Sequence, residues 1–196
     1  MRALYQDNDL LIVEKPAGVP SPTDAEGACH RLDTATSGLL VIAKNRETWL
    51  KMREAFSKNR VKKEYVALVA GEVPGSGKIE WPIGPDPKSA KRVKVNKNRV
   101  EARRNKAQEA VTFYEPIKIG LNSLLKIRIK TGRRHQIRAH LAAIGHPIVG
   151  DTLYKGPPAD RLHLHASRLE FEHPRTGQQI AVQANLDLTA ISRPAS

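Results

Sequence analysis

The chain has 196 residues, of which 40% are hydrophobic and 27% are charged, the balance of an ordinary globular protein. Its 33 Lys and Arg outnumber 20 Asp and Glu and give a formal net charge of +13, which favours a polyanionic partner such as nucleic acid. The single cysteine excludes an internal disulfide, and no apolar run approaches the roughly 18 residues of a membrane-spanning helix. We therefore expect a cytoplasmic protein without a membrane partner.

The first third of the chain predicts two strands and one helix. Residues 9–15 are mostly aliphatic, and the prolines and glycine of 16–22 should end this strand in an irregular loop. Residues 37–45 are a second aliphatic run and predict a second strand. Residues 46–60 carry apolar side chains at a spacing of three to four, which indicates an amphipathic helix.

The remainder is again rich in strands. Partly alternating apolar residues predict strands over 62–73, 110–119 and 124–130, and a small strand is expected around Ile79. A helix is predicted over 133–145, because Ile137, Leu141 and Ile144 share one helical face and Gly145 follows. Two further strands should flank the Pro-Arg-Thr-Gly turn at 174–177. Strands dominate without regular helical crossovers, so the fold class is α+β with a mixed, mostly antiparallel sheet, and 1–196 is predicted to be one domain.

Residues 88–106 form the most biased segment of the chain. They contain nine basic residues against the single acid Glu101. One interpretation is a solvated, flexible loop, and the other is an arm that contacts phosphates. On the second interpretation the candidate RNA-binding cations are Lys91, Arg92, Lys94 and Lys97.

Asp33 is the most informative carboxylate, in the stretch "HRLDTATSGLLVIAK" at 30–44. It could cap a helix or form an Asx-turn. It could also be a nucleophile, because a nearby guanidinium keeps a carboxylate ionised and able to attack an electrophilic carbon. Hydrolysis of a glycosidic bond usually takes two carboxylates, and the nearest earlier acids, Asp24 and Glu26, lie in a proline-bounded loop.

Metal and thiol chemistry have weaker signals. His163 and His165 would share one side of a strand, but His135 and His140 are five residues apart, which rotates a helix by about 140° and separates them. The chain has no second cysteine and no His-Glu-x-x-His pattern, so we predict no metal site. Cys29 has no neighbour that would activate it, and we expect a small buried residue.

Four segments together resemble the RluA-type family of RNA pseudouridine synthases. In order, they are "HRLDTATSGLLVIAK", "VKKEYVALVAGEV", "TGRRHQIRAHLAAIGHPIVGDTLY" and "LHLHASRLEFEHPRTG", and the resemblance runs from about Asp9 to Gln183. It implies that Asp33 is the essential aspartate and that Tyr65 packs on the target base. It also implies that Arg138 pairs with the aspartate and that Arg31 helps to hold the RNA open.

The resemblance further implies a mostly antiparallel sheet in two lobes with a cleft between them. The expected activity is the isomerisation of specific uridines in structured RNA, ribosomal or transfer, which needs no activated water, metal or organic cofactor. The motifs begin almost at Met1, so we expect no S4-type RNA-binding domain, and we expect a monomer. The alternatives are a catalytically inactive RNA-binding or RNA-chaperone module of the same fold and a base-excising glycosidase, which the missing second carboxylate disfavours.

Overall fold

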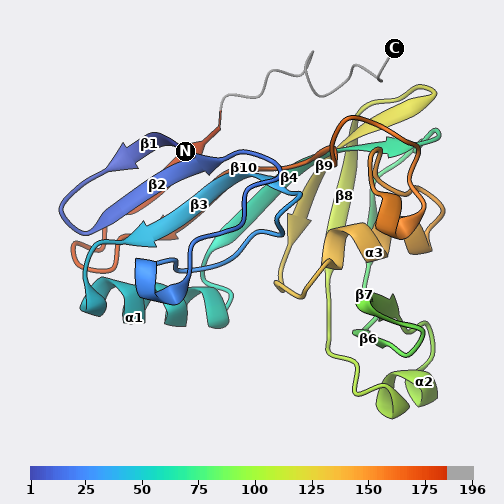
Figure 1. Cartoon of the computed structure of the whole chain (residues 1–196), viewed down its shortest axis with the longest axis horizontal. Coiled ribbons are helices and arrows are strands. Elements are labelled where there is room, and N and C mark those ends of the chain that lie inside the picture. Colours follow the sequence, from blue (N-terminus) through green and yellow to red (C-terminus); the bar gives the residue numbers. More distant parts are fainter. Residues whose placement is uncertain (185–196) are drawn as a thin grey trace. The chain divides into compact units, whose positions relative to one another are not determined.

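A computed structural model describes residues 1–184 of the chain (Figure 1). The described chain divides into two compact units, one of Met1–Tyr65 with residues 164–184 and one of Val66–His163. Within this described part, the first unit contains one α-helix and the second contains two, each together with strands of its own. The expectation of a single domain over 1–196 stays a prediction, and its last twelve residues lie outside the described part.

The first unit is built on a mixed sheet. Its strands follow the order β1-β2-β3-β10, and β11 pairs with residues 168–172 of β10 outside this order. β1 with β2, β2 with β3, and β10 with β11 pair antiparallel, whereas β3 and β10 pair in parallel. The elements are β1 Arg2–Gln6, β2 Leu10–Lys15, β3 Ser37–Ala43, α1 Arg46–Ser57, β10 Leu164–Glu172 and β11 Gln179–Gln183, with a short 3₁₀ turn at Asp24–Glu26.

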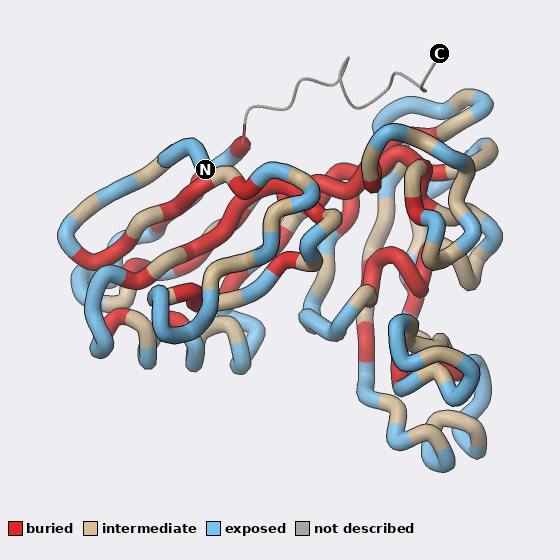
Figure 2. Tube along the Cα trace, in the orientation of Figure 1, coloured by how far each residue is buried: buried red, intermediate tan, exposed pale blue. Residues whose placement is uncertain are grey.

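Alternating aliphatic side chains give this unit its core. Leu10 and Ile12 of β2 and Leu39 and Val41 of β3 are fully buried, and Met52 of α1 packs into the same cluster. Burying one such side chain contributes about 1.5–3 kcal/mol. Figure 2 shows β3 as an almost unbroken red stretch and β2 as red interrupted by tan.

A glycine sets the approach of β3 to β10. Gly38 has a φ of +116°, and a Cβ at this position would lie 2.3 Å from the main-chain oxygen of Ala166. Only glycine fits both the dihedral angle and the contact. The parallel pairing of Gly38 with Ala166 therefore begins β3 directly after the segment that contains Asp33.

The second unit contains the rest of the structure. β4 (Lys62–Ala70) begins in the first unit and ends in the second, where the strand order is β4-β9-β8-β5. A separate two-stranded sheet is formed by β6 and β7. The elements are β5 Gly77–Ile79, β6 Ile83–Asp86, β7 Ser89–Val95, α2 Arg99–Arg104, β8 Thr112–Lys118, β9 Asn122–Ile129 and α3 Gln136–Ala143, with a 3₁₀ turn at Thr152–Tyr154.

The predicted fold class is confirmed, since the structure is a mixed α+β arrangement with a mostly antiparallel sheet. The flexible-loop interpretation of 88–106 is wrong, because the segment contains β7 and α2. Helix α3 begins at Gln136, three residues later than predicted, because His135 before it has a left-handed φ of +51°. Within the described residues, no helix has the length and apolarity needed to cross a membrane.

Candidate active site

Asp33 lies at a tight turn directly before β3. The main-chain N–H of Thr36 donates to the carbonyl oxygen of Asp33 at 2.9 Å, and the chain then enters the strand at Ser37. The Asp33 residue is half-buried. Since a strand and not a helix follows, the helix-cap alternative for Asp33 is wrong.

The Asp33 turn is braced by a lysine that is fully buried. The ammonium of Lys15, at the end of β2, donates to the carbonyl oxygens of Pro16, Val19 and Thr34 at 3.0, 2.6 and 3.2 Å. Burial lowers the pKa of Lys15, whereas the negative charge of Asp33 acts in the opposite direction. One cation thus ties the loop after β2 to the residue that follows Asp33.

Two further contacts join the same pair of loops. The N–H of Gly18 donates to the carbonyl oxygen of Thr34 at 2.9 Å. The hydroxyl of Ser21 donates to the carbonyl of Leu32 at 2.9 Å and accepts from the N–H of Leu32 at 3.0 Å. The residues on both sides of Asp33 are therefore fixed by hydrogen bonds to the loop at 16–22, which is the arrangement that a preorganised reactive carboxylate requires.

Replacing Lys15 with Met is expected to lower the free energy of unfolding by about 1–3 kcal/mol, because the carbonyl oxygens of Pro16 and Val19 lose the ammonium donor and that of Thr34 keeps only the N–H of Gly18. The turnover number should fall as well, since the turn around Asp33 loses its brace. Urea unfolding and single-turnover rates measure the two effects separately. Unchanged stability together with an unchanged rate would show that the lysine does not hold the turn.

Tyr65 is buried on β4 in the same unit as Asp33. Burial raises the pKa of the Tyr65 phenol well above its ordinary value, and the charge of Asp33 raises the pKa further. The phenol therefore stays neutral at physiological pH. A neutral aromatic ring suits packing against a base and is a poor proton acceptor. Arg31, two residues before Asp33, is exposed.

The two residues before Arg31 are structural. Burial lowers the pKa of His30 to about 3, and the positive charge of Lys63 adds to this shift. Its Nε2 accepts from the N–H of Val41 at 3.2 Å and its ring stacks on Phe56 at 4.3 Å. Burial also raises the pKa of the Cys29 thiol to about 12. Neither group is a ready acid, base or nucleophile at neutral pH.

Arg138 of α3 forms a buried bidentate ion pair with Asp151. Its Nε lies 2.7 Å from Oδ2 and its Nη2 lies 2.8 Å from Oδ1 of the carboxylate. The two side chains are 9% and 0% exposed, so the pair is shielded from solvent. Asp151 also accepts from the N–H of Tyr154 at 3.2 Å, and the Tyr154 ring lies 5.3 Å from the guanidinium carbon.

This pairing changes the account of Arg138. We expected its counter-charge to be Asp33, and within the second unit the structure gives it Asp151. Pairing with Asp33, which belongs to the first unit, stays a prediction. Two of the guanidinium's nitrogens face Asp151, so its orientation is set by a residue that the sequence analysis did not single out.

Comparison with known proteins decides the family. Residues 23–143 match the family described as RNA pseudouridylate synthase, a range that includes Asp33, Tyr65 and Arg138. The chain belongs to this family of RNA pseudouridine synthases. Its activity is that of an isomerase acting on RNA, as the resemblance implied.

Individual relatives of the synthase agree with this assignment. An uncharacterized RNA pseudouridine synthase of Helicobacter pylori is 41% identical over 86% of this chain and 72% of its own length. The tRNA pseudouridine synthase C of Haemophilus ducreyi is 34% identical over 94% of this chain and 90% of its own. The ribosomal large subunit pseudouridine synthase D of Nitrosomonas europaea is 32% identical over 97% of this chain and 64% of its own.

Solved structures show the same fold. Human RNA pseudouridylate synthase domain containing 1 has a TM-score of 0.83 at 24% identity and covers 100% of this chain and 89% of its own. Human RNA pseudouridylate synthase domain containing 4 has a TM-score of 0.76 at 23% identity and covers 97% and 90%. The fold predicted from the resemblance is therefore confirmed.

Most of the predicted RNA-binding cations of the synthase have internal partners. Arg92 pairs with Asp86 at 2.9 Å, and Lys94 pairs with Glu101. Lys97 donates to the carbonyl of Ala143 at 3.2 Å, and its ammonium lies 4.6 Å from the centre of the Trp81 ring. Lys91 is exposed, and its side chain makes no hydrogen bond or ion pair within residues 1–184. These four residues are therefore not equivalent.

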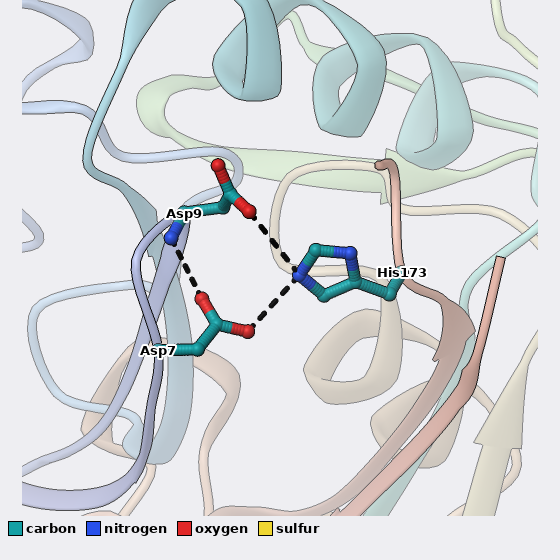
Figure 3. A group of neighbouring side chains, drawn as sticks. All are labelled: Asp7, Asp9 and His173. Carbon is teal, nitrogen blue, oxygen red and sulfur yellow. Dashed lines mark hydrogen bonds and ion pairs between the residues drawn. The ribbon is translucent and has the colours of Figure 1, made fainter. Parts of the chain in front are cut away.

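Asp7, Asp9 and His173 form a compact group in the first unit of the synthase (Figure 3). Their contacts form a hydrogen-bond network, to which Arg175 adds an ion pair with Asp9. Nε2 of His173 lies 3.0 Å from Asp7, and Nδ1 accepts main-chain N–H groups of Arg175 and Thr176 at 3.2 Å each. Since Nδ1 accepts, Nε2 carries the proton and is a donor, not a metal ligand.

The carboxylates of Asp7 and Asp9 accept further hydrogen bonds from other residues. The Nε of Arg175 donates to Asp9 at 2.6 Å, and the Tyr5 hydroxyl donates to Asp7 at 2.6 Å. Main-chain N–H groups of Asp9 and Leu10 add two bonds to Asp7 at 2.7 Å each. The network ties the β1–β2 turn to the β10–β11 turn, so its role is structural.

This network predicts a pH-dependent stability. Burial alone would raise the pKa of Asp7, but the hydrogen bonds from Tyr5, Leu10 and Asp9 outweigh it and lower the pKa from 3.8 to about 2. A lowered pKa means stability that is present above about pH 4 and is lost as the pH falls through about 2, and it amounts to about 2 kcal/mol. Asp7→Asn should remove this dependence.

Urea unfolding at a series of acidic pH values measures this dependence of the free energy of unfolding on pH. The exposed Glu47 on α1 provides the control, since Glu47→Gln should leave the wild-type pH profile unchanged. Identical pH profiles for Asp7→Asn and the wild type would show that ionisation of Asp7 is not the source of the pH-dependent stability.

Proposed function

We propose that this synthase converts uridine to pseudouridine in ribosomal or transfer RNA. Two of its relatives are named for these substrates, the large ribosomal subunit for one and tRNA for the other. In the reaction the N1–C1′ bond breaks and a C5–C1′ bond forms. The C5 proton is lost and N1 gains a proton, so atoms and charge balance without water or a redox partner.

Asp33 is the proposed nucleophile. The observation that supports this proposal is the set of hydrogen bonds that fix the main chain around Asp33. Lys15, Gly18 and Ser21 hold the main chain on both sides of it, so the carboxylate is offered from a fixed turn. A carboxylate that attacks an electrophilic carbon of the nucleotide and is later expelled divides one difficult step into two. The site has no need of a second carboxylate, because no water is activated.

Tyr65 and Arg138 are the other proposed catalytic residues. The target uridine has to leave its stack, which costs a few kcal/mol. The neutral Tyr65 ring would recover about 1–3 kcal/mol of this cost by stacking on the base. Arg138, oriented by Asp151, would supply a fixed positive charge for the negative charge that develops during the reaction.

Arg31 and the cations of the β7 region are the proposed contacts to RNA. Exposed Arg31 stands next to the reactive turn and would help to hold the RNA open. Lys91, Arg92, Lys94 and Lys97 would act on the phosphate backbone, with Lys91 the least engaged in contacts of its own. We also propose that the synthase acts in the cytoplasm, as the single buried cysteine suits a reducing compartment.

The substrate is identified by mapping pseudouridines in total RNA from cells with and without the gene. Sites that disappear from tRNA or from ribosomal RNA on deletion, and return with the wild-type gene but not with the Asp33→Asn gene, identify the target. An unchanged map of both RNA classes would contradict the proposed substrates. Return of the sites with the variant gene would contradict the proposed role of Asp33.

A further inference from the structure

A groove on the second unit is lined by four positive side chains, three of which belong neither to the proposed catalytic residues nor to the cations of the β7 region. It encloses about 380 Å³ on one side of the β6–β7 hairpin. Its cationic lining residues are Arg92, Lys106, Arg133 and Arg134, and its single acidic one is Asp86. Because Arg92 pairs with Asp86, three cations remain without a carboxylate among residues 1–184.

The arginines of the groove are held by main-chain carbonyls. Arg134 donates from Nη1 to Ala90 at 3.3 Å and from Nη2 to Lys91 at 2.9 Å. Arg133 donates from Nε to Glu109 at 3.1 Å. A guanidinium has five N–H donors, so each arginine keeps several for a ligand while its orientation is fixed. Neutral acceptors leave both positive charges uncompensated.

Lys106 completes the positive lining from the end of α2. Its φ of +48° lies in the left-handed region that favours glycine, yet the position carries a long cation. Its side chain is exposed, with no hydrogen bond or ion pair in the part of the chain that the structure describes. The local backbone is therefore better suited to glycine than to the residue present.

The surroundings of the groove point to a polymer. Arg103 and Arg104, both exposed in the last turn of α2, come shortly before Lys106 in the sequence and add two more positive charges. Several positive side chains match the successive phosphates of a nucleic-acid strand better than the charge of one small anion. Fixed guanidinium groups match phosphate oxygens in pairs, which is the recognised advantage of arginine over lysine at such sites.

We propose that the groove lined by Lys106, Arg133 and Arg134 binds the phosphodiester backbone of the substrate RNA. This inference rests on the proposed function for the identity of the polyanion, but the site is distinct from Asp33, Tyr65 and Arg138. It also redirects the expectation for residues 88–106. The chief phosphate contacts come from the groove, because the charge of Arg92 is paired within the hairpin and that of Lys94 is paired with Glu101 of α2.

The test is the salt dependence of binding to a fluorescein-labelled, uridine-containing RNA stem-loop. Each phosphate contact contributes about 0.7 to 0.9 to the slope of log affinity against log salt. The double variant Lys106→Gln with Arg133→Gln should therefore lower the slope by about 1.4–1.8. The control Lys51→Gln with Lys58→Gln removes the same charge from α1, where both lysines pair with glutamates four residues earlier, and should leave the slope nearly unchanged.

A single variant separates binding from stability. Lys106→Gly relieves the left-handed backbone, so the melting temperature should stay or rise, while the slope should fall by about 0.7–0.9. Lys106→Arg should keep the wild-type slope. A purely structural lysine would instead lower the melting temperature and leave the slope unchanged. Equal slopes for the groove variants, the control and the wild type would overturn the proposal.

Binding and isomerisation are scored separately. If the wild type forms no pseudouridine but its slope depends on Lys106 and Arg133, the groove stands and the proposed function fails. If the wild type isomerises the RNA and the groove variants bind with an unchanged slope, the groove fails and the proposed function stands. With both correct, the groove variants raise KM and keep kcat at saturating RNA, because the contacts bind ground and transition states alike.

Discussion

Asp33→Asn is expected to abolish isomerisation, lowering kcat by roughly 10⁴- to 10⁶-fold, the scale on which enzymes respond to loss of a nucleophile. The amide has nearly the shape of the carboxylate but lacks its charge and nucleophilicity. The brace around the turn uses main-chain groups of Leu32, Asp33 and Thr34, so it should survive the change. Pseudouridine formation under single-turnover conditions gives the rate.

Two observations keep this result interpretable. The melting temperature and the affinity for RNA should stay close to those of the wild type, because the side chain keeps its size and the hydrogen bonds that hold the turn use main-chain groups. The same substitution at exposed Asp24, whose contact with Arg53 at 3.5 Å is a surface one, should leave the rate unchanged. An Asp33→Asn protein that keeps most of the wild-type rate would exclude Asp33 as the nucleophile.

Arg138→Ala is expected to lower the free energy of unfolding by about 3–5 kcal/mol, because it leaves the Asp151 carboxylate buried without its partner. The rate should fall as well, since the fixed positive charge is lost. Arg138→Lys should be less damaged in stability, because charge survives although the bidentate fork does not. Urea unfolding and single-turnover kinetics measure the two quantities.

Asp151→Asn completes a double-mutant cycle with Arg138→Ala. If the two residues act through each other, the double variant should be less destabilised than the sum of the single variants. Equal losses of stability in Arg138→Ala and Arg138→Lys would show that the bidentate geometry of the arginine matters more than its charge. Full stability in Asp151→Asn would contradict the pairing, and full activity in both Arg138 variants would remove Arg138 from the proposed site.

Sequence patterns were sufficient where burial and periodicity coincide. The aliphatic runs that became β2 and β3, and the spaced apolar residues of α1, follow directly from burying one face. The segment at 88–106 was harder, because β7 and α2 bury few side chains and no apolar periodicity marks them. The short strands β1 and β6 were missed; β1 is mostly exposed, and β6 is only four residues long.

The partners of charged groups were the least predictable from sequence. Lys15 ends an aliphatic run like many solvated lysines, and only the folded loops bring three carbonyl oxygens to its ammonium. Asp151 follows Arg138 by 13 residues, a spacing that no helical or strand period connects. Arg133 and Lys106 are 27 positions apart in the sequence and share a groove only after the hairpin has folded. Such contacts depend on tertiary structure. The only hint of them in a single sequence is a charged residue next to an apolar segment.

The most direct test of the account is the nucleoside composition of uridine-labelled RNA after incubation with the purified protein in EDTA. We predict that pseudouridine accumulates one for one as uridine is lost, with no free uracil, because the base is rejoined to the same sugar without water or metal. Unchanged uridine in ribosomal and transfer RNA would contradict isomerase activity and favour an inactive binder. Free uracil would show excision by hydrolysis, and a rate that requires zinc would contradict the metal-free chemistry assigned to Asp33.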